Sequence, residues 1–371
     1  MNKFRSFLRN AYKIIFSRMI SIGLSVIIQV LLIVLVLLYL QESYVYFQIA
    51  SSLIGLLVFI AIVNEDTHPE FKIVWALLFV LLPLIGIVLY IMFKLNGRPK
   101  KYYLKYHNFN KELVSKNKES ENKIKKITKD YYDQFEYLEN MTEFSCYRNT
   151  NVTFLDSGEK FYESLLSDLE NANKFIFIET FILSKCVMWE RILNFLKAKA
   201  SDGVEVRVLY DDFGSAKYCP FNYHKKLRKL GIKCYKFNTV YPVVTSYHNN
   251  RDHRKIVIID GVISYTGGLN LSDEYVNITH PFGRWLDFGV RLYGEATNTF
   301  TILFLQNYGL SSKKYQNYDE YIVNDSGVIS DEVVFPFGTG PRKEYYANIA
   351  TDVFLNIINS AKEIGRASCR E

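Results

Sequence analysis

The sequence predicts an α/β protein in which N-terminal transmembrane helices precede one lobe built from a mixed β-sheet flanked by helices. Three observations favour this fold class. Residues 1–93 contain three long apolar runs without a charged side chain. From about residue 150, strand patterns alternate with helix patterns, which is typical of a parallel or mixed sheet covered by helices. A helix near the C-terminus repeats the first helix of the lobe, so we also expect a second lobe that is truncated at its first helix.

Composition narrows the class of protein further. The 371 residues include 45 Lys and Arg against 38 Asp and Glu, a formal net charge of +7, and 49% are hydrophobic. These values exclude a collagen, a disordered chain, a coiled coil and a small disulfide-bonded scaffold. The apolar runs exclude a purely soluble protein. The five cysteines show no C-x-x-C pair and no metal-binding spacing, and their odd number argues against a full disulfide framework.

A membrane segment is predicted over residues 19–93, after a basic flank formed by residues 1–18. Its apolar runs cover residues 19–40, 44–63 and 73–93, and a helix of about 20 residues spans the ~30 Å hydrocarbon layer. We therefore expect a multi-pass protein of the cell membrane. Basic residues flank the segment on both sides, and by the positive-inside rule both flanks are expected in the cytoplasm. Three crossings would instead put the two flanks on opposite sides of the membrane. Either one run is re-entrant or interfacial, or the charge rule fails at one end.

A basic connector over residues 94–150 leads to the lobe over residues 151–330. The connector is either a solvated linker or a patch that lies on anionic headgroups. Within the lobe, apolar periodicity predicts a regular alternation of helices and strands. The predicted helices cover residues 161–170, 189–200 and 223–230, and the predicted strands cover residues 174–183, 204–210 and 232–237.

The most informative stretch is HRKIVIIDGVISYTGGLN, residues 253–270. We expect a β-branched strand over residues 255–259 and a return strand over residues 262–266. Between them, Asp260 and Gly261 have the sequence of a two-residue hairpin turn.

This turn sets a register for the hairpin. Lys255 is predicted to lie opposite Thr266, and His253 opposite Gly268. Both side chains have the same parity on the strand, so they point the same way. The residues that the return strand brings beside them are Gly267, Gly268 and Asn270.

Such a set of residues suits a phosphodiester. A neutral imidazole at His253 is a nucleophile at pH 7, and a phosphate does not repel it. Lys255 and Asn270 can neutralise and bond the non-bridging oxygens as charge builds up in the transition state. The glycines let backbone N–H groups approach the phosphate. Asp260 most simply stabilises the turn and orients a neighbour.

The same residues form the spacing H-x-K-x4-D-x6-G-[GS]-x-N, which resembles the signature of the phospholipase D superfamily at every position. Further blocks are similar to bacterial cardiolipin synthases. These are GVEVRVLYDDFGS, RDHRKIVIIDG, YTGGLNLSDEY and WLDFGVRLYG in the lobe, and KIVWALLFVLLPLIGIVLYIMF in the membrane segment.

The resemblance implies a phosphatidyltransferase with a phospholipase D-like lobe. A histidine would accept a phosphatidyl group from one phosphatidylglycerol, and the hydroxyl of a second would displace it, giving cardiolipin and glycerol. The substrate partner would be anionic phospholipid in a membrane, not nucleic acid, and no metal or other cofactor is expected.

The resemblance also assigns roles to residues. It implies that the catalytic residues are His253, Lys255 and Asp260, and that the phosphate is bound by Asn270, Gly267 and Gly268. Glu179 stands in the E-x-x-I block of the family. It either lines the pocket or has a structural role.

Catalysis in the superfamily uses two such motifs, because a second histidine protonates the leaving oxygen, and this sequence has one H-x-K-x4-D. Residues 352–361 echo the helix predicted over residues 161–172, so we interpret residues 331–371 as the start of a truncated second lobe. The small polar tail from about Gly365 is expected to be foreign to it. The chain alone is then inactive or impaired unless self-association brings two His253 residues together. The alternatives are a phospholipase D-like hydrolase and a catalytically dead membrane protein that binds lipid.

Overall fold

The protein is represented by a computed structural model that describes part of the chain. The described residues are 44–64, 69–81, 132–142, 144–240, 251–314, 316–339 and 349–362, together with residue 90 and seven single residues between 27 and 39. The chain divides into two compact units, Met1–Lys101 with Asn238–Arg251, and Tyr102–Phe237 with Asp252–Glu371.

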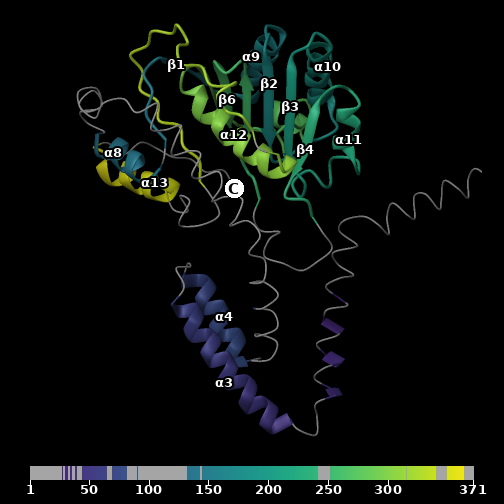
Figure 1. Cartoon of the computed structure of the whole chain (residues 1–371), viewed down its shortest axis with the longest axis vertical. Coiled ribbons are helices and arrows are strands. Elements are labelled where there is room, and N and C mark those ends of the chain that lie inside the picture. Colours follow the sequence, from purple (N-terminus) through teal and green to yellow (C-terminus); the bar gives the residue numbers. More distant parts are fainter. Residues whose placement is uncertain are drawn as a thin grey trace, which may run out of the picture. The chain divides into compact units, whose positions relative to one another are not determined.

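The first unit contains two helices that pack against each other, α3 (Tyr44–Val63) and α4 (Pro69–Leu81) (Figure 1). Helix α3 coincides with the second predicted apolar run, and α4 overlaps the third. Most of the first run lies outside the described residues. In the part of the chain that the structure describes, no helix combines the length and the apolar character that crossing a membrane requires. The predicted transmembrane helices are therefore not confirmed and stay a prediction.

A seven-stranded sheet forms the centre of the second unit, in the order β1-β7-β6-β5-β2-β3-β4. Strands β2, β3 and β4 are parallel, and the other neighbours pair antiparallel. The sheet is therefore mixed, as the sequence predicts. The strands are β1 (Thr150–Leu155), β2 (Phe175–Thr180), β3 (Glu205–Asp211), β4 (Lys233–Phe237), β5 (Ile256–Ile259), β6 (Ile263–Gly267) and β7 (Gly289–Gly294).

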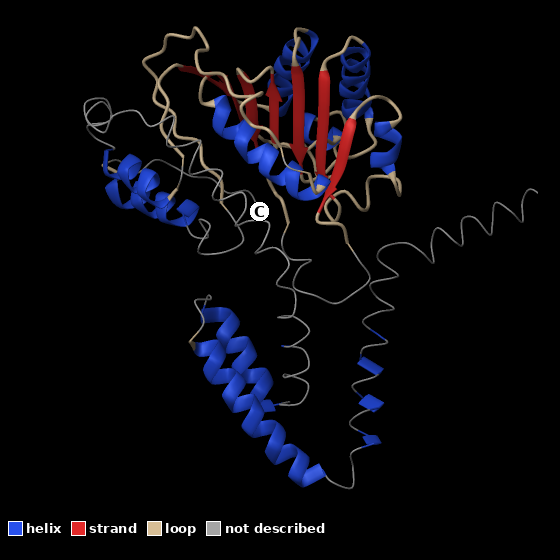
Figure 2. Cartoon of the chain, in the orientation of Figure 1, coloured by secondary structure: helices blue, strands red, loops and turns tan. Residues whose placement is uncertain are grey.

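Helices cover both faces of this sheet (Figure 2). On one face lie α9 (Gly158–Glu170), α10 (Val187–Ser201) and α11 (Tyr223–Arg228), and on the other lies α12 (Thr297–Ser312). Alternate residues of β5 enter the two cores: Val257 packs with the first group of helices, and Ile258 packs with α12. Because both faces are covered, strand β5 (IVII) is apolar throughout instead of alternating with polar residues.

The β5–β6 hairpin differs from its predicted register by one residue. Ile256 lies opposite Thr266, so the loop holds three residues and Lys255 comes opposite Gly267 when the register is extended. The turn itself still closes over Asp260 and Gly261, because the Val262 N–H donates to the Ile259 carbonyl (3.2 Å). The Asp260 N–H donates to the Phe175 carbonyl (2.9 Å), which extends the pairing of β5 with β2 by one residue.

The helix predicted near the C-terminus is present as α13 (Ile349–Ser360) and packs against α8 (Tyr132–Met141). The Tyr137 hydroxyl donates to Asp352 at 2.5 Å across this contact. The apolar residues of α13 that match the buried Leu165, Leu166 and Leu169 of α9 are exposed; they are Phe354, Leu355 and Ile358.

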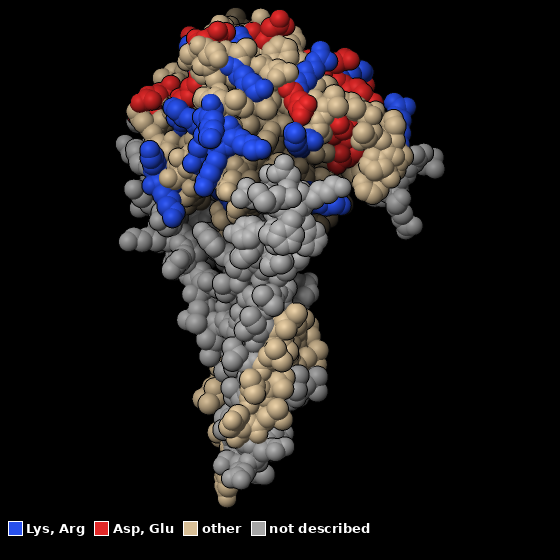
Figure 3. Space-filling model, turned by 90° about the vertical axis from the view of Figure 1, so that its right-hand side faces the viewer, with Lys and Arg blue, Asp and Glu red and all other residues tan. Residues whose placement is uncertain are grey.

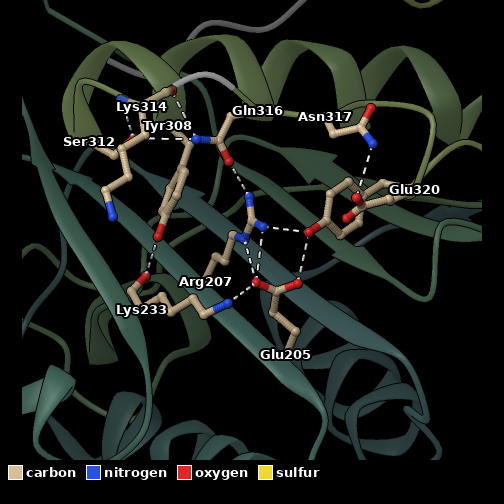
Figure 4. A network of polar contacts seen from close by, with 10 residues as sticks. Glu205, Arg207, Lys233, Tyr308, Ser312, Lys314, Gln316, Asn317 and Glu320 are labelled. Atoms are coloured by element: carbon tan, nitrogen blue, oxygen red, sulfur yellow. Dashed lines mark hydrogen bonds and ion pairs between the residues drawn. The ribbon is translucent and has the colours of Figure 1, made fainter.

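A buried arginine ties the segment after α12 to the sheet (Figure 4). Arg207 on β3 donates to Glu205 at 3.0 Å and to Gln316 at 2.6 Å. Its guanidinium lies about 5 Å from three aromatic rings, those of Phe177, Tyr308 and Tyr321. Each donor group of the planar fork thus has a specific neighbour, which a lysine cannot reproduce.

We expect Arg207→Lys to lower the free energy of unfolding by about 2–3 kcal/mol, because it breaks a buried ion pair and the contacts with three rings. Thermal and urea unfolding followed by circular dichroism measure this loss. Arg191→Lys, on the exposed surface of α10, is the matched control and should change stability by less than about 0.5 kcal/mol. Equal effects of the two substitutions would contradict a structural role for the Arg207 contacts.

Candidate active site

His253 and Lys255 lie at one end of the sheet, just before β5 begins. The Lys255 ammonium is 3.1 Å from Nδ1 of His253 and donates to the His253 carbonyl at 2.7 Å. The ring of Phe181, which follows β2, lies 4.7 Å from the imidazole between ring centres. The antiparallel pairing of β5 with β2 brings the start of one strand beside the end of the other, which places Phe181 at the site.

The surroundings favour a neutral imidazole. Partial burial, and then the charge of Lys255, lower the pKa of His253 below its usual value of 6.5. Burial also lowers the pKa of Lys255 to about 8, against the opposing charges of Asp252 and Asp287. At neutral pH the site therefore combines an uncharged imidazole with a lysine that still carries most of its charge.

The contact between the two side chains also selects a tautomer of His253. An ammonium group has only donors, so Lys255 donates to Nδ1 and the ring hydrogen lies on Nε2. An imidazole in this form has no free lone pair directed away from Lys255. When Lys255 turns to another acceptor, the lone pair on Nδ1 is released, or the hydrogen moves to Nδ1 and leaves Nε2 free.

Both motif glycines lie where another group comes too close to leave room for a Cβ, backbone at Gly267 and a side chain at Gly268. Gly267 pairs with Gly289 on β7, and a Cβ at Gly267 would lie 2.6 Å from the Phe288 carbonyl oxygen. A Cβ at Gly268 would meet the Asp287 carboxylate at 2.1 Å, and the Gly268 N–H donates to Phe288. The glycines therefore place Asp287 close to the site, which is a different role from the predicted binding of phosphate through their N–H groups.

Asn270 is buried, and its amide joins two segments of the site. Its oxygen accepts a hydrogen bond from the Ile182 N–H at 3.0 Å, and its nitrogen donates to the Tyr275 hydroxyl at 2.8 Å. These bonds fix the segment after β2 against the segment after β6. One amide hydrogen of Asn270 has no hydrogen-bond acceptor among the described residues, and we keep it as the candidate for the predicted contact with phosphate.

Asp260 lies at the far end of β5 from His253. Its carboxylate accepts three backbone hydrogen bonds, from the N–H groups of Asn173, Lys174 and Phe175 at 2.7–2.9 Å. Its own φ is +54°, a conformation that Asp tolerates better than most residues. These contacts match the predicted stabilisation of the turn, and the structure does not bring Asp260 together with His253 and Lys255.

Glu179 is buried on the sheet face that α12 covers. Its carboxylate accepts from Asn307 of α12 at 2.8 Å and lies 3.4 Å from Arg254. Burial raises the pKa of Glu179 well above its usual range, and Arg254 opposes this effect. Asp252 and Glu179 contact the same guanidinium, since Arg254 lies 3.1 Å from Asp252 and 3.4 Å from Glu179. Glu179 thus lies beneath the segment that carries His253 rather than at the imidazole.

Asp252 and Asp211 hold the backbone on either side of His253. The Arg254 N–H and side chain both donate to the Asp252 carboxylate, at 3.2 and 3.1 Å. The Asp252 N–H donates to Asp211 at the end of β3 (3.3 Å). The position of Asp252 directly before the motif histidine is a sequence signal that could have pointed to it. No such signal connects Asp211 to the site, since it lies 41 residues earlier in the chain.

Among the described residues, no three His, Cys, Asp or Glu side chains gather as a metal site requires. His280 is exposed in the loop before β7, and His248 lies outside the described residues.

Two family models match the chain. Residues 165–281 match the model described as cardiolipin synthase, PLD-like domain, and residues 53–94 match the phospholipase D-nuclease N-terminal model. A cardiolipin synthase of Staphylococcus aureus (strain Mu50) is 30% identical over 319 residues, covering 78% of this chain and 60% of that protein. The chain is thus similar to cardiolipin synthases in its phospholipase D-like domain and over most of its length. The family resemblance inferred from the motifs is therefore confirmed.

A second cardiolipin synthase gives a similar match. A cardiolipin synthase of Alkalihalophilus pseudofirmus is 29% identical over 325 residues, covering 86% of this chain and 63% of that protein. Among solved structures, phosphatidylserine synthase from Haemophilus influenzae Rd KW20 covers 63% of this chain and 48% of its own, with 14% identity and a TM-score of 0.38. The chain spans less than two thirds of the length of these cardiolipin synthases.

We expect Asp260→Ala to destabilise the fold by about 3 kcal/mol, because three backbone donors lose a charged acceptor. Asp260→Asn keeps one acceptor oxygen and tolerates the positive φ, so its loss should be about half as large. Unfolding followed by circular dichroism gives both values. An unchanged stability in Asp260→Ala, with a lost reaction at His253, would instead favour a direct catalytic role.

Proposed function

We propose that this chain carries the phosphatidyl-transferring site of a cardiolipin synthase and that His253 is its nucleophile. The observation that carries the proposal is the neutral imidazole held between Lys255 and Phe181, at the position of the family motif. The proposed substrate is phosphatidylglycerol, an anionic lipid whose phosphodiester needs an uncharged nucleophile and a neighbouring cation.

In the first proposed step, the phosphate of phosphatidylglycerol attracts Lys255 away from His253. This frees a lone pair on the imidazole, which attacks phosphorus. A P–N bond forms and the P–O bond to the glycerol headgroup breaks. The departing oxygen takes up a proton and leaves as glycerol. Lys255 neutralises the charge that builds up on the non-bridging oxygens, and Asn270 bonds them through its remaining amide hydrogen.

In the second step, a hydroxyl group of another phosphatidylglycerol attacks the same phosphorus and loses its proton. The P–N bond breaks, its electrons return to His253, and cardiolipin is released. Both steps need a group that gives and takes the proton of the glycerol oxygen. A general acid of this kind contributes about 10²–10⁴-fold to the rate. The sequence has one H-x-K-x4-D motif, so we propose that this chain alone turns over slowly or stops at the covalent stage.

We also propose that residues 1–93 attach the chain to the membrane that contains its substrate. Their three uncharged apolar runs support this attachment, as do the exposed apolar side chains of α3, among them Leu53, Leu57 and Ile60. Self-association, which would supply a second His253, stays a prediction.

The covalent step can be tested without turnover. We expect the full chain, mixed in detergent with phosphatidylglycerol that is radiolabelled in its phosphate, to retain label after denaturation in dodecyl sulfate at mildly alkaline pH, because a P–N bond to imidazole is labile to acid but survives these conditions. His253→Ala should abolish the label. His280→Ala, which removes an exposed imidazole outside the site, should leave it unchanged. A wild-type chain that takes up no label would favour a lipid-binding protein over an enzyme.

The labelled product distinguishes transfer from hydrolysis. When unlabelled phosphatidylglycerol is added to the labelled chain, release of label as cardiolipin supports the transferase, and release as phosphatidic acid supports the hydrolase.

The rate of labelling should depend on pH through both side chains. His253 must be neutral, and its pKa is lowered, so the rate should rise with pH through a midpoint below 6.5. Lys255 must be charged, so the rate should fall again as pH passes about 8. In Lys255→Met the fall of the labelling rate above pH 8 should disappear, and the maximum rate should drop by about 10²-fold or more. A rate that keeps rising above pH 9 in the wild type would contradict the role of Lys255.

A further inference from the structure

One stretch of the sequence contains the chain's excess of positive charge. Residues 213–251 carry eight Lys or Arg and no Asp or Glu, which exceeds the net charge of +7 for the whole chain. Two of the eight are neutralised by carboxylates: Lys233 bonds Glu205, and Lys236 bonds Asp212 at 3.1 Å. A run of like charge without intervening acids indicates a surface for an anionic partner.

The first part of the stretch exposes aromatic side chains. The loop between β3 and α11 carries Phe213, Tyr218 and Phe221, which are 48%, 37% and 68% exposed. The Lys217 ammonium lies 5.6 Å from the centre of the Tyr218 ring. Large apolar rings that are this exposed, and that alternate with a cation, are typical of a membrane interface, where one part of the side chain is in contact with lipid and another with water.

Helix α11 and the residue after it supply the exposed basic side chains, which are Lys225, Lys226, Arg228 and Lys229. Figure 3 views the molecule from the side on which α11 lies in Figure 1, and Lys and Arg side chains gather on this face. The field of the cluster acts on its neighbour His224. Burial, followed by the charges of Lys236, Arg228 and Lys225, lowers the pKa of His224 to about 4.

This loop is also joined directly to the candidate active site. Asp211 accepts hydrogen bonds from the Phe213 and Gly214 N–H groups at 2.8 and 2.9 Å, while its other oxygen accepts from Asp252, the neighbour of His253. The Ser215 hydroxyl donates to the carbonyl of Phe181 at 3.2 Å. The exposed rings and the imidazole therefore belong to the same end of the sheet and share a buried carboxylate.

We propose that residues 213–229, the aromatic–basic element, dock on the surface of an anionic phospholipid bilayer and hold the His253 end of the sheet against it. The exposed rings enter the headgroup region, and the basic side chains of α11 bind anionic headgroups. This inference rests on the proposed function in one respect, because both name a membrane lipid as partner. It goes beyond that function by assigning a second lipid contact that performs no chemistry.

A tryptophan placed in the element can report on docking. Phe221→Trp is introduced into the full chain together with Trp75→Phe, which removes a tryptophan from the apolar segment. The chain is reconstituted in vesicles whose acyl chains carry bromine near the headgroup. The fluorescence added by Phe221→Trp should be quenched in vesicles that contain phosphatidylglycerol and remain unquenched in vesicles of phosphatidylcholine alone.

Charge reversal tests the role of α11. Lys225→Glu/Lys226→Glu should raise the phosphatidylglycerol fraction needed for half-maximal quenching by at least about fivefold. Lys160→Glu/Lys174→Glu makes the same change of charge at exposed positions on other segments and should leave that fraction unchanged. Circular dichroism checks that both variants fold. Quenching that is absent, equal in both kinds of vesicle, or equally weakened by both variants would overturn the proposal, and absent quenching would favour a protein as the occupant of this surface.

The failure of this inference can be told apart from failure of the proposed function. Docking requires no reaction, so His253→Ala should be quenched as fully as the parent chain. Docking without covalent label would overturn the proposed function alone. Covalent label in the Lys225→Glu/Lys226→Glu chain, at the parent rate in detergent and in vesicles, would overturn the docking role alone.

Discussion

The antiparallel pairing of β5 with β2 is the constraint on which the rest of the site depends. It sets the start of one strand beside the end of the other, so the residues before β5 meet the residues after β2. Hydrogen bonds hold both ends of this pair. At one end Asp260 accepts from three backbone N–H groups before β2, and at the other Asn270 accepts from Ile182 after it. Two motif residues that are far apart in space thus perform one task, which is to fix the register of the pair.

Buried carboxylates anchor the segment that carries His253. Asp252 and Glu179 are almost fully buried, and two carboxylates beside one cation are stable when one of them is protonated. Arg254 supplies the cation, and burial raises the pKa of Glu179, which favours its protonated form. Removal of any one member would leave a buried charge uncompensated, so these ion pairs tie residues 252 and 254, on either side of His253, to the end of β2. These contacts position the backbone of His253, while its imidazole ring stays exposed to solvent.

The sequence predicted the two strands of the hairpin and the proximity of the His253 and Lys255 side chains. The proximity follows because residues two apart in an extended chain point the same way. The sequence did not predict the register of the β5–β6 hairpin, in which Ile259 pairs with Ile263. It also did not predict the contacts of Asp260 with the segment before β2, which lies 85–87 residues earlier in the chain. The sequence also did not identify Phe181 as a site residue, because an aromatic residue at the end of an apolar strand has the pattern of a core residue. The glycines are sites of close approach: the backbone of residues 288–289 approaches Gly267, and the Asp287 carboxylate approaches Gly268. Their predicted contact with a phosphate stays a prediction. Sequence thus predicts contacts within a motif better than contacts between segments.

The arrangement of Lys255 explains how one cation can both restrain and activate the proposed nucleophile. Without substrate, its ammonium lies 3.1 Å from Nδ1 of His253 and occupies a lone pair of the imidazole. Its charge also helps to keep the ring unprotonated. A phosphodiester is a stronger acceptor for an ammonium than a neutral nitrogen is, so substrate would draw the lysine away and leave an uncharged ring with a free lone pair. The nucleophile would then become available only when a phosphate is present to receive it, which limits reaction with other electrophiles.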